Sequence, residues 1–425
     1  MQLKFEILFF VTLWPAHCFA NGLESRASLE SPASVAAKLP PCALPCFASA
    51  IANSTCSPTD AQCICSNEII AADAGQCVLA SCSLPEALST KNITLTACDA
   101  PVRDVSSPYR VMAITLGIIT TIITLARLIF KRFFSASETL TLDDILIIGA
   151  LLMHISCTTI NVEGLAAHGL GKDIWTLSPN ELKTFVFFFY IIENHFFLEI
   201  TLAKLSLLLF YLNIFPDKFI RRLIWGTALV ILLLGIASTF VIIFQCAPVQ
   251  YFWTQYDGHS TGHCLDINAF AWCNAALNIA TDIWMLGIPL SQIRKLKLHW
   301  KKKLGAAFMF LTGLFVTVAA ILRMQSLVHF ADSSNPTWDQ LIVAFWCTIE
   351  VNVGIICTCL PTFRLILLRL FPHVFSTGTK HSNSYVRSSD RRSGPSSITG
   401  KKGYQLSELE STTELNSSRT DSASV

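Results

Sequence analysis

Residues 223–244 read LIWGTALVILLLGIASTFVIIF and contain no charged side chain. A helix of about 20 apolar residues spans the hydrocarbon core of a bilayer, so this stretch predicts a transmembrane helix. Six further apolar runs predict six more such helices: Tyr109–Phe130, Leu142–Val162, Phe185–Phe215, Ile267–Leu290, Leu304–Leu327 and Leu341–Leu360. The sequence therefore predicts an all-α membrane protein with a seven-helix transmembrane bundle over residues 105–370.

The composition supports this class and argues against others. The chain has 425 residues, of which 52% are hydrophobic and 14% are charged, whereas about 25% are charged in an average soluble domain. A net charge of +2 gives no electrostatic basis for binding nucleic acid, so the expected partner is the lipid bilayer. We find no phosphate-binding glycine loop, nucleophile elbow or zinc-type ligand cluster, and we expect no enzyme.

A cysteine-rich module occupies residues 41–99. Its eight cysteines follow the spacing C-x3-C-x9-C-x6-C-x-C-x11-C-x4-C-x15-C, at positions Cys42, Cys46, Cys56, Cys63, Cys65, Cys77, Cys82 and Cys98. So short a stretch buries little core, and an even number of cysteines indicates a disulfide framework in an oxidising compartment. We expect a small extracellular domain of short helices, with the disulfide pairing left open.

The N-terminal segment is consistent with secretion of this module. Residues 1–20 have a positive start, a short apolar centre and Ala20 before a plausible cleavage point, as in a signal peptide. Residues 21–40 form a small polar leader. The sequons at Asn53 and Asn92 lie inside the module and predict a glycoprotein.

The basic residues predict the orientation in the membrane. Alternate loops carry twelve Lys or Arg: Arg127, Lys131, Arg132, Lys218, Arg221, Arg222, Arg294, Lys295, Lys297, Lys301, Lys302 and Lys303. The opposite loops between the first and the last of these carry Lys172 and Lys183. Excess basic charge marks the cytoplasmic side, so we expect a multi-pass plasma-membrane protein with its N-terminus outside and its C-terminus inside. Residues 371–425 are rich in Ser and Thr and predict a disordered cytoplasmic tail.

Polar residues within the spans predict a buried network. Ionisable groups in a membrane are costly and face the bundle interior. His195 and Glu199 are four residues apart and share one helix face. The network is expected to comprise His195, Glu199, Lys204, Asp282, Arg323, Glu350 and Asn352. Two roles stay open, a structural one in helix packing and a functional one as a ligand pocket or switch. In the large outer loop, Cys246 and Cys264 are expected to form a further disulfide.

The module resembles the CFEM domain of fungal extracellular membrane proteins. The resemblance rests on Pro41-Cys42-Ala43, on Thr59-Asp60 before Cys63-Ile64-Cys65, and on the later cysteines. Some members of that family bind haem through an aspartate at the position of Asp60, which makes Asp60 the candidate haem-iron ligand. An apolar face for the porphyrin could come from Leu44, Phe47, Ile51, Ile64, Ile69 and Ile70. Alternatively, Asp60 caps a helix and the apolar residues form a small core.

The region from about residue 105 to 370 resembles the fungal rhodopsin-domain family. The matching stretches include Asp143-Asp144, His168-Gly169-Leu170-Gly171-Lys172, Lys204-Leu205-Ser206, Phe244–Val249, Arg323, Glu350-Val351-Asn352 and Cys357–Pro361. The span 341–360 contains no lysine, so a retinal Schiff base is not expected there.

The two resemblances together imply the receptor-like proteins of filamentous ascomycetes. They predict a G-protein-coupled-receptor-like sensor of extracellular or host-surface cues, with an unknown extracellular ligand. A heterotrimeric G protein is a possible partner through the basic stretch Arg294–Lys303, which could instead bind anionic lipids. The alternative function is haem or iron acquisition, or adhesion, with the bundle as an anchor.

Overall fold

The computed structural model describes residues 31–134, 141–255, 260–295, 300–331, 333 and 335–370. The predicted signal peptide, residues 21–30 of the leader and the tail 371–425 lie outside this part of the chain. Lys297 also lies outside it, and the side chains of residues 293–309 are not described.

Five short helices form the cysteine-rich module: α2 (Pro32–Lys38), α3 (Leu44–Ala52), α4 (Ala61–Ser66), α5 (Glu68–Ser81) and α6 (Leu84–Ala97). Several begin at a side chain that caps free backbone N–H groups. Asn67 accepts from the backbone of Ile69 and Ile70 at the start of α5, and Ser83 and Glu86 form a capping box at the start of α6. The helical module therefore begins within the predicted polar leader, at α2.

Disulfides and two small apolar clusters hold the module together. The pairs are Cys42–Cys82, Cys46–Cys77, Cys56–Cys63 and Cys65–Cys98. One cluster centres on Ala43, Cys46, Val78 and Ala87, and the other on Ala50, Cys56, Ile70 and Ala74. Sulfur atoms thus take part in both clusters, as expected for a domain too small to bury a larger core.

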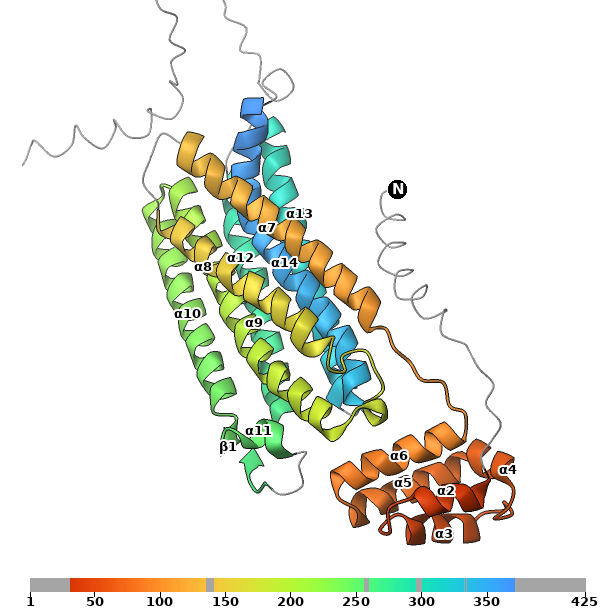
Figure 1. The fold of residues 1–425 in the computed structure, drawn as a ribbon. Coiled ribbons are helices and arrows are strands. Elements are labelled where there is room, and N and C mark those ends of the chain that lie inside the picture. The colour runs from red at the N-terminus through yellow and green to blue at the C-terminus, as the bar shows by residue number, and fades with distance from the viewer. Residues whose placement is uncertain are drawn as a thin grey trace, which may run out of the picture. The chain divides into compact units, whose positions relative to one another are not determined.

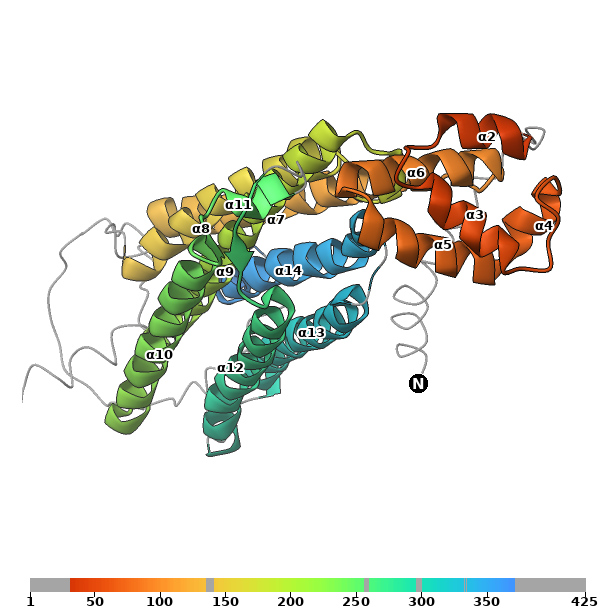
Figure 2. The same ribbon diagram turned by 90° about the horizontal axis from the view of Figure 1, so that it is seen from below.

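Seven long helices follow in the described part of the chain: α7 (Ser106–Phe134), α8 (Leu142–Thr159), α9 (Pro179–Ile214), α10 (Lys218–Ile243), α12 (Ile267–Lys295), α13 (Trp300–Ala331) and α14 (Pro336–Leu370). They form one bundle (Figure 1). Helix α9 packs against α8, α10 and α14, and α14 packs against α7, α9 and α13 (Figure 2). These two helices therefore bring most of the others into contact.

Six of the described helices are long and apolar enough to cross a membrane. Helix α12 has sufficient length, but Asn274, Asn278 and Asp282 lower its mean hydropathy. The all-α membrane fold predicted from the sequence is confirmed. The least apolar member of the seven is α12, whereas the sequence had pointed to the second span, which Asp143, Asp144 and His154 interrupt.

The bundle has an apolar exterior and encloses charged side chains within a largely apolar interior. Helix α7 presents an exposed row of Val111, Ile118, Ile122 and Ile129, and α10 presents several exposed leucines. In contrast, Arg127, Asp143, His154, Glu199, Arg323 and Glu350 are buried. An exposed apolar belt of this kind is the surface that lipid tails cover.

Shorter elements complete the end of the bundle at which α7 begins and α8 finishes, here termed the first end. A π-helical turn, η1 (Ile160–Leu165), continues α8, and η2 (Ile174–Thr176) precedes α9. Strands β1 (Cys246–Ala247) and β2 (His263–Cys264) pair as a hairpin around α11 (Tyr251–Thr254). The Cys246–Cys264 disulfide joins the two strands. Closing a loop of this size contributes about 3 kcal/mol to stability.

Candidate functional site

A chain of charged and polar side chains crosses the middle of the bundle. Lys204 Nζ lies 2.8 Å from Asp282 Oδ1 and donates to Asn278 Oδ1 at 2.6 Å. Asn278 Nδ2 donates to Glu350 Oε1 at 2.6 Å, and Arg323 Nε donates to Glu350 Oε2 at 2.8 Å. One chain therefore connects α9, α12, α14 and α13. Lys204, Asp282, Arg323 and Glu350, four of the seven residues predicted for the network, belong to it.

Pairing is what makes these charges tolerable inside the bundle. Arg323 and Glu350 are only 4% and 2% exposed, and the guanidinium also stacks over the Phe196 ring at 4.9 Å. Removing one partner from such a pair leaves the other charge buried and uncompensated. The two ion pairs of the chain sum to zero charge, so they fix helix packing without adding net charge to the bundle.

A second pair lies beside this chain. His154 Nδ1 on α8 lies 2.8 Å from Glu199 Oε1 on α9, and both side chains are buried. His195, which the sequence places on the same helix face as Glu199 and in the same network, is not the partner of that carboxylate. The His195 ring instead donates from Nδ1 to the Ile191 carbonyl of its own helix at 2.9 Å. A histidine in a helix can bond to the backbone carbonyl four residues before it, as His195 does, instead of to the side chain four residues after it. The partner of Glu199 therefore comes from another helix.

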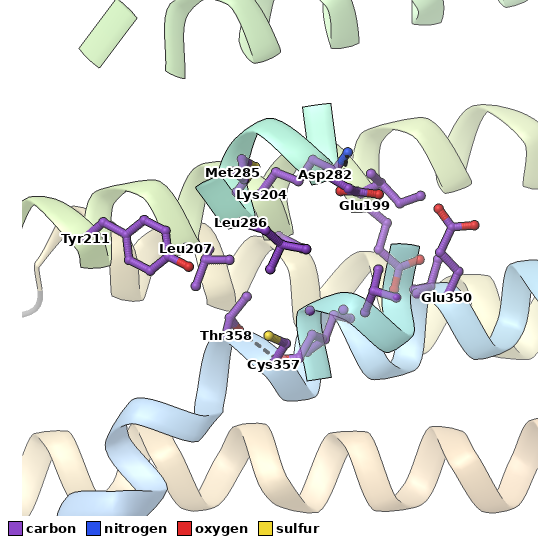
Figure 3. A pocket seen from close by; sticks show the side chains of 17 residues that line it. Glu199, Lys204, Leu207, Tyr211, Asp282, Met285, Leu286, Glu350, Cys357 and Thr358 are labelled. Atoms are coloured by element: carbon purple, nitrogen blue, oxygen red, sulfur yellow. Dashed lines mark hydrogen bonds and ion pairs between the residues drawn. The ribbon is translucent and has the colours of Figure 1, made fainter. Parts of the chain in front are cut away.

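Two cavities lie on opposite sides of these pairs. The smaller, of about 80 Å³, is lined by Glu199, Lys204, Asp282 and Glu350 and extends to Tyr211 (Figure 3). The larger, of about 110 Å³, lies toward the first end and is lined by His154, Arg323 and, on α14, Gln340 and Asn352. Each pair thus has one partner on each cavity: His154 and Arg323 line the larger, whereas Glu199 and Glu350 line the smaller.

Several buried polar atoms at these cavities have no hydrogen-bond partner within the described residues. On the larger cavity they are His154 Nε2, Glu193 Oε2, Arg323 Nη2 and Gln340 Oε1; on the smaller they are Glu199 Oε2 and Asp282 Oδ2. Buried polar atoms are usually satisfied by protein or ordered water. Their concentration on two cavities indicates sites where water or a ligand would bind.

The seventh residue predicted for the network, Asn352, joins α14 to α7. Its Oδ1 accepts from Thr120 Oγ1 at 2.6 Å, and it lines the larger cavity. Nearer the first end, Tyr109 Oη donates to Asn161 Oδ1 at 2.9 Å and lies 3.1 Å from Thr348 Oγ1. Asn161 belongs to the π-helical turn η1, a local geometry often found at functional sites.

The opposite end of the bundle, the second end, holds a charged cluster that sequence reasoning missed. Arg127 Nη2 lies 2.9 Å from Asp143 Oδ2, and Lys131 Nζ lies 3.0 Å from Asp143 and 2.8 Å from Asp144. Arg127 also donates to the Thr358 carbonyl on α14. We had counted Arg127 as a loop charge, which is wrong: it is 1% exposed and lies inside α7. The sequence signal for this cluster was that basic residues end the first span and acidic residues begin the second, which places opposite charges at the same end of the bundle.

The linker before α7 is anchored at the first end. Arg103 donates to Asp173 through its backbone N and its guanidinium, and Asn335 Nδ2 donates to the same carboxylate at 2.7 Å. Next to it, burial acts to raise the pKa of Asp104. Hydrogen bonds from Ser106 and the charge of Lys172 outweigh burial and lower that pKa. These contacts were also not predicted from the sequence.

The residues expected to hold haem have local structural contacts in the module, and haem binding stays a prediction. Asp60 is exposed, but its Oδ1 accepts from the Cys63 backbone N at 3.1 Å as the N-cap of α4. Four of the six apolar residues expected to line the face, namely Phe47, Ile51, Ile64 and Ile70, pack into the apolar cluster around Ala50, while Leu44 and Ile69 are exposed. The structure therefore matches the alternative reading, in which Asp60 caps a helix and the apolar residues form a core.

For metal binding and for glycosylation, the structure gives only the local surroundings of the candidate residues. Within the described ranges, no group of three or more His, Cys, Asp and Glu side chains is arranged to hold a metal ion. Asn53 ends α3 and Asn92 lies in α6, and both side chains are exposed. Glycosylation at these two positions stays a prediction.

Comparison with known proteins places both parts of the chain. A SAT4 family membrane protein of Emericella nidulans is 31% identical over 239 residues, covering 54% of this chain and 58% of that protein. A polyenoic acids biosynthesis gene cluster protein of Metarhizium anisopliae is 26% identical, covering 56% and 69%. Receptor GIN3 of Arthrobotrys oligospora is 26% identical over 176 residues, covering 41% of this chain and 42% of the receptor. The match therefore spans a little over half the length of the first of these relatives and less than half of the receptor.

No solved structure matches the chain significantly. The model of the CFEM domain matches residues 35–99, which includes all eight cysteines of the module and the end of α2. The model of the fungal rhodopsin domain matches residues 126–369, more than half of the chain. The protein therefore belongs to the fungal rhodopsin-domain family and carries a CFEM domain before its transmembrane bundle.

Proposed function

We propose that this protein is a plasma-membrane sensor of extracellular or host-surface cues that acts like a G-protein-coupled receptor and is not an enzyme. The CFEM module and the first end would face outward, and the second end would face the cytoplasm. The signal-like N-terminus and the excess of basic residues in loops at the second end support this orientation.

The observation that carries the proposal is the arrangement of cavities and ion pairs. Arg323–Glu350 and His154–Glu199 each connect the larger cavity to the smaller one. A ligand that competes for Arg323 or His154 would change the partners of Glu350 or Glu199 and thereby the packing of α8, α9, α13 and α14. Such a coupling between two sites is what a sensor requires.

The relatives support the same class. One of them carries the name Receptor GIN3, and the similarity extends over 176 residues. A role in reception in that protein makes the same role the leading proposal for this bundle.

Co-purification from native membranes tests the proposed partner. We expect a G-protein α subunit to accompany the full chain and to be lost when Lys301, Lys302 and Lys303 are changed to Glu. The matched control reverses Lys218 and Arg222, which are exposed at the same end. Equal losses in both variants would point to general attraction to acidic lipids, and absence of any α subunit with the unmodified chain would rule out the proposed coupling.

The alternative, haem or iron capture or adhesion through the CFEM module, also has a direct test. In a haem titration of the full chain, Asp60→Asn keeps an oxygen that can cap α4 but removes the carboxylate, and Asp73→Asn on α5 is the exposed control. A Soret shift lost only in Asp60→Asn would establish haem ligation. No shift with the unmodified chain would exclude it.

A further inference from the structure

The larger cavity contains ionic groups that the protein itself leaves partly unsatisfied. Arg323 uses Nε to bind Glu350, but its Nη2 has no hydrogen-bond partner among the described residues. Gln340 Oε1 and His154 Nε2 are in the same condition, and the three side chains are 4%, 7% and 2% exposed. Leaving a buried donor or acceptor unpaired is unfavourable, so a ligand that completes these bonds binds more tightly.

Glu193 is the ionisable group of this cavity that has no opposite charge. It lies on α9, one turn before Phe196, and its Oε2 has no partner. No described Lys, Arg or His lies within ion-pair distance of Glu193, whereas Arg323 and His154 each have a carboxylate partner. The cavity therefore offers one unpaired carboxylate and one incompletely bonded guanidinium that do not contact each other.

The rest of the cavity is apolar. Leu165, Phe189, Ile192, Phe197 and Val343 are among the residues that line it. A volume of about 110 Å³ holds about four water molecules at roughly 30 Å³ each and is smaller than the roughly 150 Å³ cavity that accommodates benzene, so it fits an organic molecule of about six heavy atoms. A ligand of this size needs an apolar body together with a positive group and a negative group.

We infer that the larger cavity binds an apolar α-amino acid as a zwitterion. The carboxylate would bind Arg323 Nη2 and His154 Nε2, the ammonium group would bind Glu193 and Gln340 Oε1, and the side chain would contact the apolar wall. A zwitterion balances Glu193 without displacing Glu350 from Arg323. This inference rests on the proposed function, because it assigns a class of ligand to the sensor.

The test measures equilibrium binding to the full-length protein in lipid nanodiscs, with glycine, alanine and 2-aminobutyric acid as probes. We expect saturable binding of at least alanine. Two analogues of alanine each lack one charge: propanoic acid has no ammonium group and ethylamine has no carboxylate. Each should bind about 10- to 100-fold more weakly than alanine, the change expected when a charged hydrogen bond is lost.

Glu193→Gln identifies the site. This variant should weaken the binding of alanine about 10-fold and leave that of propanoic acid unchanged, so that the preference for the zwitterion disappears. The control Glu163→Gln removes an exposed carboxylate of η1, 68% accessible, and should change neither affinity. A general loss of fold would weaken both ligands together, and that result would overturn the assignment, as would no binding of any probe.

Failure here is distinguishable from failure of the proposed function. Binding to the purified chain needs no G protein, so alanine binding without an associated α subunit would support the ligand site and reject the coupling. An associated α subunit with no binding of the three amino acids would reject the ligand class and leave the sensor role in place.

Discussion

The CFEM module and the transmembrane bundle stabilise themselves in opposite ways. The module places disulfides in two small apolar clusters and leaves its charged side chains outside. The bundle has an apolar exterior and places its ion pairs inside, with Arg127, Glu199 and Glu350 almost fully buried. Water solvates the surface of the module, whereas lipid covers the bundle. Charged side chains therefore lie on the outside of the module, whereas the bundle buries its ion pairs and exposes apolar side chains.

The difference has a consequence for function. Covalent cross-links allow one arrangement of the module, whereas ion pairs and hydrogen bonds can exchange partners. Glu350 bonds both Asn278 on α12 and Arg323 on α13, so one movement of α14 would affect two other helices of the network directly. The part of the molecule suited to change its conformation is therefore the bundle, and the module is suited to present a fixed surface.

Breaking a buried pair should give the largest effect. Glu350→Gln leaves the Arg323 guanidinium buried without its carboxylate and should lower the free energy of unfolding by about 3–5 kcal/mol. The control is Glu163→Gln, which disrupts an exposed pair with Arg110 at 3.6 Å and should cost at most about 1 kcal/mol. Unfolding in detergent micelles measures both. Equal effects would mean that burial does not distinguish these pairs.

Removing a disulfide should affect the module and leave the bundle folded. Replacing Cys42 and Cys82 by Ser opens a loop with a sequence separation of 40 and should destabilise the module by about 2–4 kcal/mol. Hydrogen exchange should rise throughout α3, α5 and α6 and stay unchanged in α9 and α14. The exposed free cysteine Cys273 provides the control, and Cys273→Ser should change neither region. Loss of protection in the bundle would contradict independent stabilisation.

The sequence predicted the helices and the cysteine-rich module more successfully than it predicted which side chains contact each other. Apolar runs and cysteine spacing were sufficient for the helical membrane fold and the CFEM module. The pairing of the eight cysteines was not, because it depends on how α3, α5 and α6 pack. Lys204, Asp282, Arg323 and Glu350 were recognised as network residues because charges are rare in membrane spans. Which charged side chains pair depends on how each helix is rotated about its axis, and the sequence does not give that rotation. For this reason the predicted network contains His195 and not His154.

The ion pair between α9 and α12 should show measurable coupling. Lys204→Met and Asp282→Leu each leave one buried charge, whereas the double variant leaves neither. We expect a coupling free energy of about 1–2 kcal/mol in a double-mutant cycle measured by unfolding. Because Asn278 also accepts from Lys204, Lys204→Met should cost more than Asp282→Leu. Additive effects would indicate that the two side chains act independently.

The smallest expected effect concerns an exposed helix start in the module. Hydrogen bonds from the Ser83 side chain and backbone lower the pKa of Glu86 below its ordinary value of 4.5. A carboxyl whose folded-state pKa is depressed contributes stability above its unfolded-state value, and the contribution is lost as the pH falls through the folded-state value. The protection factors of the amides in the first turn of α6, which are corrected for the intrinsic pH dependence of exchange, should therefore be smaller below pH 4.5 than at neutral pH. Glu86→Gln should remove this pH dependence without altering exchange in the bundle. An unchanged pH profile in Glu86→Gln would show that another group controls this turn, because Gln can still bond to the Ser83 backbone but does not titrate.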